Sequence, residues 1–475
     1  MSLYDVVIRD GTVVSTSGSR RADVGVRNGR VAAVSADGLI KPGQFSVDGP
    51  VAADVIDARG KLVFPGLIDA HTHFGLTSGD TATSDDFHSG TIAAACGGVT
   101  TVIDFVTPAP GGTVAAALAE RLREASRAVI DYGFHGVLIE PAAVGEVPGL
   151  IGQGVTSFKL YMAYKARGLM AGDGTLAGAL EAARRSGGLI GVHAEDNEMV
   201  DAATAALARA GHTAMPFFAA ARPAQAERAA IARACRQAEQ AGTALHVFHL
   251  STAAGLEEIR EARLRGLLVW AETCPHYLTF TDEVCARPDG YRFAMNPPLR
   301  KQADVDALWD GLAEGEIQTV ASDHCPFPLA AKARGAASFL DVPAGVGGTE
   351  LILTVLLSEG VAKGRLSLER LAQVTSANPA ALFGLYAEKG RLGPGADADL
   401  VIVDPDAEWT VTPGELHSQG DHTPYEGLKA RGRVVVTMAK GQVVYRDGAF
   451  VGEAGAGHYL PRAKAREVHQ VQSAG

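Results

Sequence analysis

A regular alternation of two kinds of segment spans the middle of the chain, from about Lys61 to about Gly395. Short apolar runs with the length of buried strands are followed by polar loops or by alanine-rich stretches of helical periodicity. Such β-then-α units predict an α/β fold, a TIM-like (β/α)8 barrel, and a doubly wound open sheet is the alternative. The apolar runs are residues 62–74, 98–106, 132–139, 154–164, 188–196, 244–251, 268–278 and 317–327.

The two ends of the chain follow a different pattern, in which apolar and polar residues alternate around Asp-Gly, Asn-Gly and Lys-Gly turns. Neither end supplies enough strands for a stable core of its own. We therefore predict one small β-sandwich domain built from residues 1–60 and 396–455, with the barrel of residues 61–395 inserted between them. Residues 456–475 form a polar tail, which we expect to be mobile or to pack on a partner subunit.

The composition argues against several functional classes. A net charge of -11 repels nucleic-acid backbones, so no nucleic-acid partner is expected. No uninterrupted apolar stretch of about twenty residues exists, so no membrane span is expected either. The first residues lack the pattern of a signal peptide, and the 5 cysteines are scattered without a CxxC pair. These features predict a cytoplasmic protein without disulfides.

Polar side chains stand at the ends of several apolar runs. His71 and His73 end the first run, His193 and His249 end the fifth and sixth, and Asp323 lies in the last one. Residues i and i+2 of a strand point to the same side, and the C-terminal ends of barrel strands meet at one face. Two structural histidines would be the alternative for the HxH pair alone. With the other strand-end residues, the pattern predicts a site for two divalent metal ions, of which zinc suits neutral imidazole well.

Lys159 does not fit this site as an ordinary lysine. An ammonium with a pKa of about 10.4 should be expelled from a cage of cations. A surface lysine or a salt-bridged lysine is the alternative, but the segment SFKLYM places it inside an apolar strand. Burying an unpaired charge there is costly. A modification that makes the side chain anionic would resolve the conflict.

The motifs of the chain resemble those of the hydantoinase/dihydropyrimidinase family in the amidohydrolase superfamily. The resemblance covers nearly the whole chain and rests on PGLIDAHTHF, GTIAAACGGVTTVIDF, SFKLYMAYK, VHAED, HVFHLST, ETCPHYL, NPPLR and ASDHCPF. It implies that CO₂ converts Lys159 to a carbamate that bridges two divalent ions, with zinc as the expected metal. One ion would be held by His71, His73, Lys159 and Asp323, and the other by Lys159, His193 and His249.

The resemblance also implies the reaction, which is metal-dependent hydrolysis of the cyclic amide bond of hydantoins and dihydropyrimidines. A hydroxide bridging the two ions would attack the carbonyl carbon, and Asp323 would carry its proton to the leaving nitrogen. Tyr164 stands where family members place the phenol that stabilises the oxyanion. The small cyclic amide or ureide substrate would contact the backbone of Asn296 and Ala344, where many relatives have Ser and Asn. Loops 74–85 and 165–173 would surround its exocyclic group.

Several further polar residues have simpler expected roles. His246 has the strand parity opposite to that of the metal ligands and is expected outside the site. His276 and His324 are expected to provide hydrogen bonds around the ligands. Glu195 and Asp196 are expected to cap the helix that follows them.

Other functions remain as alternatives. Dihydroorotase is disfavoured, because its members carry an arginine just after the HxH pair, where this chain has Phe74 and Gly75. Allantoinase stays open, because ETCPHYL and NPPLR also occur there. A non-catalytic scaffold of the collapsin response mediator type is the alternative from another class, and the complete set of metal ligands argues against it. By analogy with the family, we expect a homotetramer.

Overall fold

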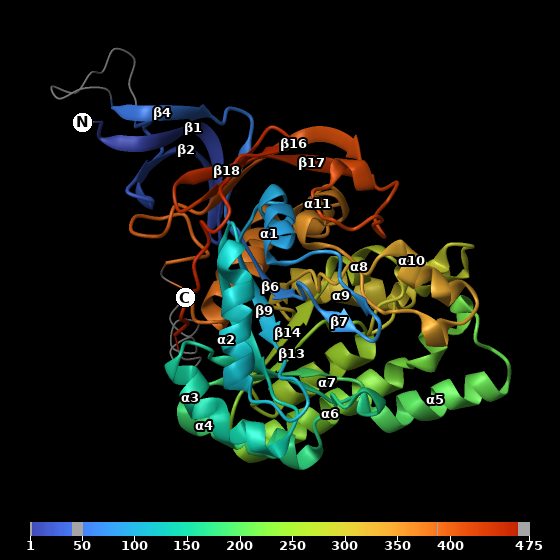
Figure 1. The fold of residues 1–475 in the computed structure, drawn as a ribbon. Helices are drawn as coiled ribbons and strands as arrows, with labels where there is room; N and C mark the ends of the chain where they lie inside the picture. The colour runs from blue at the N-terminus through green and yellow to red at the C-terminus, as the bar shows by residue number, and fades with distance from the viewer. Residues whose placement is uncertain (1, 40–50, 387, 464–475) are drawn as a thin grey trace.

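Two large sheets organise the computed structural model, which describes residues 2–39, 51–386 and 388–463. One sheet has 8 strands in the order β15-β14-β13-β12-β11-β10-β9-β6, with parallel neighbours. The other has 9 strands and combines both ends of the chain. In Figure 1 the blue N-terminal strands accordingly lie beside the red C-terminal strands, on one side of the parallel sheet.

The parallel sheet is a nearly closed barrel. Its strands are β6 (Leu67–Thr72), β9 (Val99–Val106), β10 (Asp131–Val137), β11 (Ser157–Tyr161), β12 (Leu189–His193), β13 (Leu245–Val247), β14 (Val269–Thr273) and β15 (Thr319–Val320). The first and last strands meet just beyond β15, where Thr72 pairs with His324 in a parallel bridge. The His73 amide also donates to the His324 carbonyl at 2.9 Å. The predicted (β/α)8 class is therefore confirmed.

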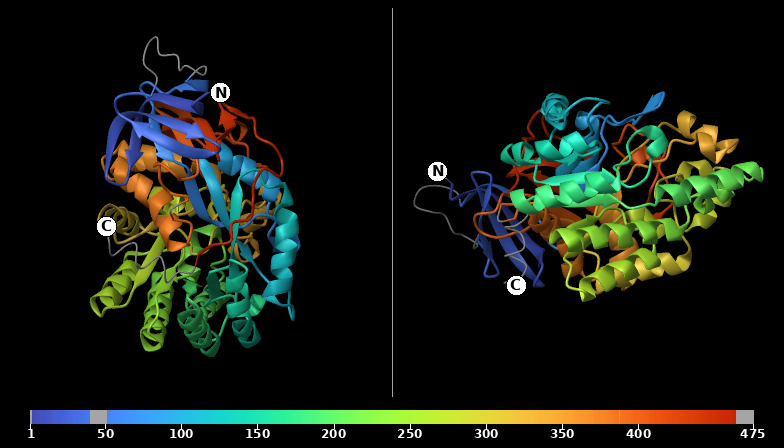
Figure 2. Two further views of the ribbon diagram at one scale, coloured as in Figure 1. Left: turned by 90° about the vertical axis from the view of Figure 1, so that its left-hand side faces the viewer. Right: turned by 90° about the horizontal axis from the view of Figure 1, so that it is seen from below.

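The helices surround the barrel, as the two views of Figure 2 also make visible. They are α1 (Phe87–Cys96), α2 (Val114–Glu124), α3 (Val147–Gly152), α4 (Asp173–Ser186), α5 (Asn197–Arg209), α6 (Ala224–Ala241), α7 (Ala253–Leu264), α8 (Pro275–Thr279), α9 (Gln302–Ala313), α10 (Leu329–Lys332), α11 (Ile352–Val355), α12 (Leu368–Ala372) and α13 (Asn378–Leu382). Helix α6 illustrates why they form: Ala226, Ala230, Ala234 and Ala238 bury one face at four-residue spacing. It ends at Gly242, which has a φ of 64°.

The sheet from the chain ends curls around its own hydrophobic cluster. Its strands are β1 (Tyr4–Ser15), β2 (Gly18–Arg27), β3 (Arg30–Ser35), β4 (Ala52–Asp57), β5 (Leu62–Pro65), β16 (Leu400–Thr410), β17 (Lys429–Ala439), β18 (Gln442–Arg446) and β19 (Ala449–Phe450). Val24 of β2 and Met438 of β17 belong to one buried cluster although their strands are not neighbours. The first apolar run is divided, because β5 pairs with β1 and β16 whereas β6 enters the barrel.

The last described residues return to the barrel. Leu460 donates its amide to Tyr132 of β10 at 2.8 Å, and Arg462 bonds to the Gly154 carbonyl at 3.1 Å. Residues 464–475, the rest of the expected tail, lie outside the described residues. The 5 cysteines are all free and buried. Within the described ranges, no helix combines the length and the apolar character that crossing a membrane requires.

Candidate metal centre

Three of the predicted ligands meet where the barrel closes. His71 is in β6, His73 follows it, and Asp323 lies three residues after β15. Asp323 Oδ1 is 3.2 Å from His71 Nε2 and 3.1 Å from His73 Nε2. Their ligand atoms lie within 4.8 Å of one another, which is close enough for one shared cation. The contacts between β6 and the segment after β15 therefore build this half of the centre.

His193 and His249 form the other half. His193 ends β12, His249 lies two residues beyond β13, and His193 Nδ1 is 3.0 Å from His249 Nε2. The rings of His71 and His249 have centroids 5.4 Å apart, so the two halves adjoin. Burial lowers the pKa of all three of these histidines, which keeps the imidazoles neutral and able to bind metal.

Lys159 lies between the two halves. It belongs to β11 and is 1 % exposed, and its Nζ is 2.9 Å from His71 Nε2. The Nζ also lies 4.3 Å from the ring centre of Phe105 and 4.9 Å from that of Phe248. Burial lowers the pKa of Lys159 to about 8. The structure thus brings the amine and the predicted metal ligands to one place.

Buried carboxylates determine which nitrogen of two histidines faces the centre. Glu272 Oε1 lies 2.7 Å from His71 Nδ1, and Glu195 Oε2 lies 2.7 Å from His193 Nε2. An ionised carboxylate accepts, so the ring nitrogen beside it carries the hydrogen and the opposite nitrogen presents its lone pair to the centre. Burial raises the pKa of Glu272, so this tautomer of His71 holds for the ionised form of Glu272. Arg222 in turn binds Glu195, with its Nε 2.9 Å from Oε1. Burial raises the pKa of Glu195, but Arg222 and His193 outweigh burial and lower it.

Backbone conformation is unusual at the same place. Tyr164, His249 and Asp323 have φ angles of 69°, 39° and 48°. Positive φ costs a residue other than glycine about 1–3 kcal/mol, and such residues gather at functional sites. Here the strained backbone directs each of these three side chains toward the centre.

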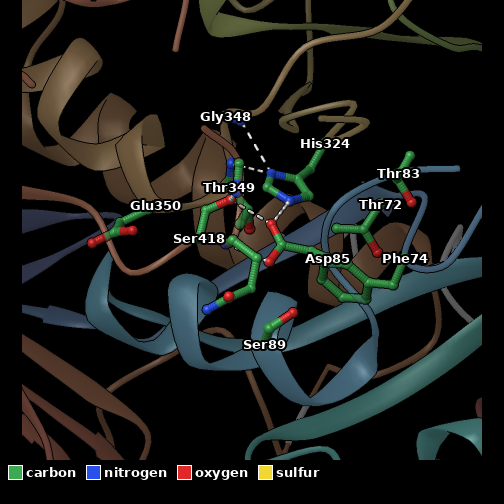
Figure 3. Close-up of polar contacts among 12 residues, drawn as sticks. Thr72, Phe74, Thr83, Asp85, Ser89, His324, Gly348, Thr349, Glu350 and Ser418 are labelled. Atoms are coloured by element: carbon green, nitrogen blue, oxygen red, sulfur yellow. Dashed lines mark hydrogen bonds and ion pairs between the residues drawn. The ribbon is translucent and has the colours of Figure 1, made fainter. Parts of the chain in front are cut away.

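A second hydrogen-bonded group supports the segment that carries Asp323 (Figure 3). His324 Nδ1 accepts from the amides of Gly348 and Thr349 at 3.1 and 3.3 Å, so its hydrogen is on Nε2. Nε2 donates to Asp85 Oδ2 at 2.9 Å, and Ser418 donates to the same carboxylate. Burial raises the pKa of Asp85, but these partners outweigh it and lower the pKa to about 2.

A cavity of 530 Å³ opens onto the centre. It is lined by metal-ligand candidates, by Tyr164, Asn296 and Ala344, and by residues of the two loops expected around an exocyclic group, including Leu76 and Leu169. Burial raises the pKa of Tyr164 to about 12, so its phenol is protonated and can donate. Tyr164 also lies over His193, with ring centroids 4.9 Å apart.

Comparisons with known proteins agree with this arrangement. The model of the amidohydrolase family matches residues 62–444. The chain belongs to the amidohydrolase family. It is 41 % identical to a D-hydantoinase of Geobacillus stearothermophilus over 465 residues, which is 96 % of each chain. It is 40 % identical to a D-phenylhydantoinase of Escherichia coli O1:K1 / APEC, covering 96 % of this chain and 98 % of that one.

A solved structure confirms the fold of this amidohydrolase. The dihydropyrimidinase of Brevibacillus agri NCHU1002 superposes with a TM-score of 0.91 at 39 % identity. The alignment covers 96 % of this chain and 98 % of that chain. Membership of the hydantoinase/dihydropyrimidinase family, predicted from the motifs, is thereby confirmed.

Some supporting residues of this amidohydrolase differ from the sequence-based expectations. Asp196 caps α5, accepting from the Met199 amide at 3.0 Å, as predicted. Glu195 does not cap the helix, because its carboxylate binds His193 and Arg222, and the cap expectation was wrong for it. His276 forms no hydrogen bond through either ring nitrogen within the described ranges, so the role expected for it is not seen.

The partners Glu272 and Arg222 were missed from the sequence. Glu272 stands in the motif ETCPHYL, one residue before the end of β14, and that strand-end position was the one available signal for it. No local signal identifies Arg222, which lies 27 residues from Glu195.

Proposed function

We propose that this protein hydrolyses the cyclic amide bond of hydantoins and dihydropyrimidines at a centre of two divalent metal ions. The proposal depends on one observation above all. Four histidines, Asp323 and Lys159 converge at one end of the barrel, in a chain that closely matches hydantoinases over its whole length. The proposed metal ligands are His71, His73, Lys159, His193, His249 and Asp323.

The side chains fit such a pair of ions. His71 and His193 are each held by a carboxylate so that a lone pair points inward. His249 directs its Nε2 to within 3.0 Å of His193 Nδ1, so both nitrogens can face one ion. Imidazole and carboxylate ligands suit zinc, which we propose as the metal. When bound, two divalent ions would acidify water to a nucleophile at neutral pH and polarise a carbonyl.

Lys159 is proposed to carry a carbamate derived from CO₂. A neutral amine is the form that combines with CO₂, with loss of one proton and formation of an N–C bond. The pKa of about 8 leaves more neutral amine at pH 7 than an ordinary lysine would have. The product is an anionic oxygen donor, which removes the conflict of a cation among cations.

Asp323 is proposed to move the proton of the attacking water. Its position beside His71 and His73 places a carboxylate oxygen at the reacting face. The water oxygen bonds to the amide carbon, the C–N bond breaks, and Asp323 delivers the proton to the leaving nitrogen. The product is the ring-opened carboxylate.

Tyr164 is proposed to stabilise the oxyanion that forms at the carbonyl. Its pKa of about 12 keeps the hydroxyl protonated in the neutral range, so it can donate to a developing negative charge. Asn296 and Ala344 line the same cavity and are proposed to bind the ring amide through their backbone groups. A homotetramer and a cytoplasmic location belong to the same proposal.

A substrate panel on the purified protein tests the function. We expect turnover of dihydrouracil or 5-substituted hydantoins, and metal analysis should find about two ions per chain. Turnover of allantoin alone would favour allantoinase. A metal-free protein that turns over none of these substrates would favour a scaffold.

Lys159→Ala tests the carbamate separately. The substitution should abolish both metal loading and turnover, because the proposed anionic ligand would be lost. Retention of metal content and turnover together would contradict the carbamate.

A further inference from the structure

A buried lysine outside the metal centre joins the two loops that line its cavity. Lys332 ends α10 and is 0 % exposed. Its Nζ donates to the carbonyls of Ala294, Pro343 and Gly345 at 2.8, 3.3 and 2.7 Å. Within the described ranges these carbonyl oxygens are its hydrogen-bond acceptors, and no ion pair to a carboxylate accompanies them.

The three carbonyls flank the two residues proposed to bind substrate through their backbone. Ala294 lies two residues before Asn296, and Pro343 and Gly345 lie on either side of Ala344. Asn296 and Ala344 line the metal cavity, whereas Lys332 does not. Lys332 can therefore act on substrate only through these loops.

The Ala294 carbonyl that accepts from Lys332 also accepts a hydrogen bond from the backbone of the other loop. The Gly345 amide donates to the Ala294 carbonyl at 2.9 Å, so that oxygen accepts both from Gly345 and from Lys332. Beyond it, a Cβ on Gly345 would lie 2.7 Å from the Cys325 carbonyl oxygen, which shows how closely the loop approaches the segment after Asp323. The spacing between the two loops is thus determined by one ammonium and one amide.

We propose that Lys332 is a positioning residue for substrate binding: its ammonium holds the Asn296 and Ala344 loops at the spacing that the ring amide of the substrate requires. Three carbonyl acceptors match the three N–H donors of the protonated amine, and hydrogen bonds from the charged form are about twice as strong as neutral ones. Burial lowers the pKa of Lys332 to about 7, so near neutral pH it is this contact geometry, in the charged and in the neutral form, that restricts the two loops. A small displacement of substrate-binding groups weakens binding and orientation. The inference rests on the proposed hydrolysis of cyclic amides.

The test compares Lys332→Met with Lys363→Met, which replaces an exposed lysine paired with Glu359. For Lys332→Met we expect KM for the best substrate to rise at least tenfold. We expect kcat to change less than threefold and metal content to stay the same, because the centre itself is untouched. Lys363→Met should match the unsubstituted protein. A well-folded Lys332→Met protein with unchanged KM would overturn the inference, as would a loss of stability alone.

Two further measurements keep the test decisive. If Lys332→Met folds poorly, Lys332→Gln is the second variant, because its amide retains two N–H donors. A KM between that of the unsubstituted protein and the value expected for Lys332→Met supports the inference. A KM equal to that of the unsubstituted protein refutes it. Hydrogen exchange of the amides of residues 344–346 should accelerate in either variant, independently of turnover, and unchanged exchange refutes the inference. An unsubstituted protein without turnover would instead contradict the proposed function, while the exchange result would still decide the role of Lys332.

Discussion

At the scale of single residues, the site depends on which nitrogen of each histidine is free. Glu272 and Glu195 each hold one ring nitrogen, so the other is available to a metal. Arg222 keeps Glu195 ionised although it is fully buried. Side chains that do not touch an ion therefore also contribute to metal binding. The contribution of the two carboxylates can be measured as a change in metal affinity when either is replaced.

Glu195→Gln should weaken metal binding about 10–100-fold, the usual effect of removing a partner of a ligating histidine. The amide can no longer hold the His193 hydrogen as firmly, and Arg222 loses its carboxylate. Titration with a competing chelator would measure the change. Asp196→Asn is the matched control, because this neighbour caps α5 and should leave metal affinity unchanged. Equal affinities in the two variants would contradict the role of Glu195.

Tyr164→Phe should lower kcat about 10²–10³-fold, the typical effect of losing one oxyanion donor. Metal content should be unchanged. Because the pKa of Tyr164 is about 12, its phenol stays protonated from neutral pH to about pH 10, so the ratio of the two kcat values should be constant over that range. Steady-state kinetics at several pH values would check this. Equal kcat values for the two proteins would contradict the role of Tyr164 as the oxyanion donor.

At the scale of elements, the metal centre depends on the closure of the barrel between β6 and the segment after β15. Asp69 of β6 accepts from the Ser322 amide at 2.9 Å and from the Thr349 hydroxyl at 2.7 Å. The His324–Asp85 pair adds a connection from that segment to Ser418 (Figure 3). The Gln419 amide also donates to Asp85 at 2.9 Å. These contacts keep Asp323 beside His71 and His73.

Asp85→Asn should reduce the free energy of unfolding by about 2 kcal/mol near pH 7, since a pKa lowered from 3.8 to about 2 corresponds to that energy. The pKa of Asp85 is depressed on folding, so its contribution is present above about pH 4 and is lost as the pH falls toward 2. Urea unfolding of both proteins at pH 7 and at acidic pH would measure it. Asp80→Asn, at an exposed carboxylate of the same loop, is the control. If the difference in free energy of unfolding between the two proteins stays constant on acidification, Asp85 does not stabilise the fold through its ionised carboxylate.

At the scale of the whole molecule, a buried ion cluster joins the barrel to the sheet of the chain ends. Lys389 Nζ lies 2.7 Å from Asp131 of β10, 2.7 Å from Asp399 and 3.0 Å from Asp397. All four side chains are at most 9 % exposed. Burial lowers the pKa of Lys389, but the three carboxylates outweigh it and raise the pKa. The two parts of the fold are therefore coupled through a buried cation, and the half-exposed Lys440 adds a second contact to Asp131.

Lys389→Met should destabilise the protein by about 3–5 kcal/mol, because it leaves buried carboxylates without their cation. Calorimetry or urea unfolding would measure the loss. Lys440→Met is the control: Lys440 also contacts Asp131 but is 37 % exposed, so its removal should cost much less. Equal losses from the two substitutions would show that Lys389 does not couple the two parts.

The sequence by itself determined the barrel class, the pairing of the two chain ends and the six metal-ligand candidates. These features have local signals: strand periodicity, the HxH spacing, and polar residues at the ends of apolar runs. The structure brings those six side chains together because parallel strands end at one face of the barrel. The metal ions and the carbamate remain proposals.

Only the tertiary structure decided which residues support the ligands and how the loops around the cavity are held. Arg222 reaches Glu195, Ser418 reaches Asp85, and Lys332 reaches the loop of Ala294 across separations of 27, 333 and 38 residues. Each pair is joined by the packing of distant segments, and a charged residue on its own gives no local sign of its partner. The sequence therefore specifies the reacting groups, while folding decides their orientation, their protonation and the width of the cavity.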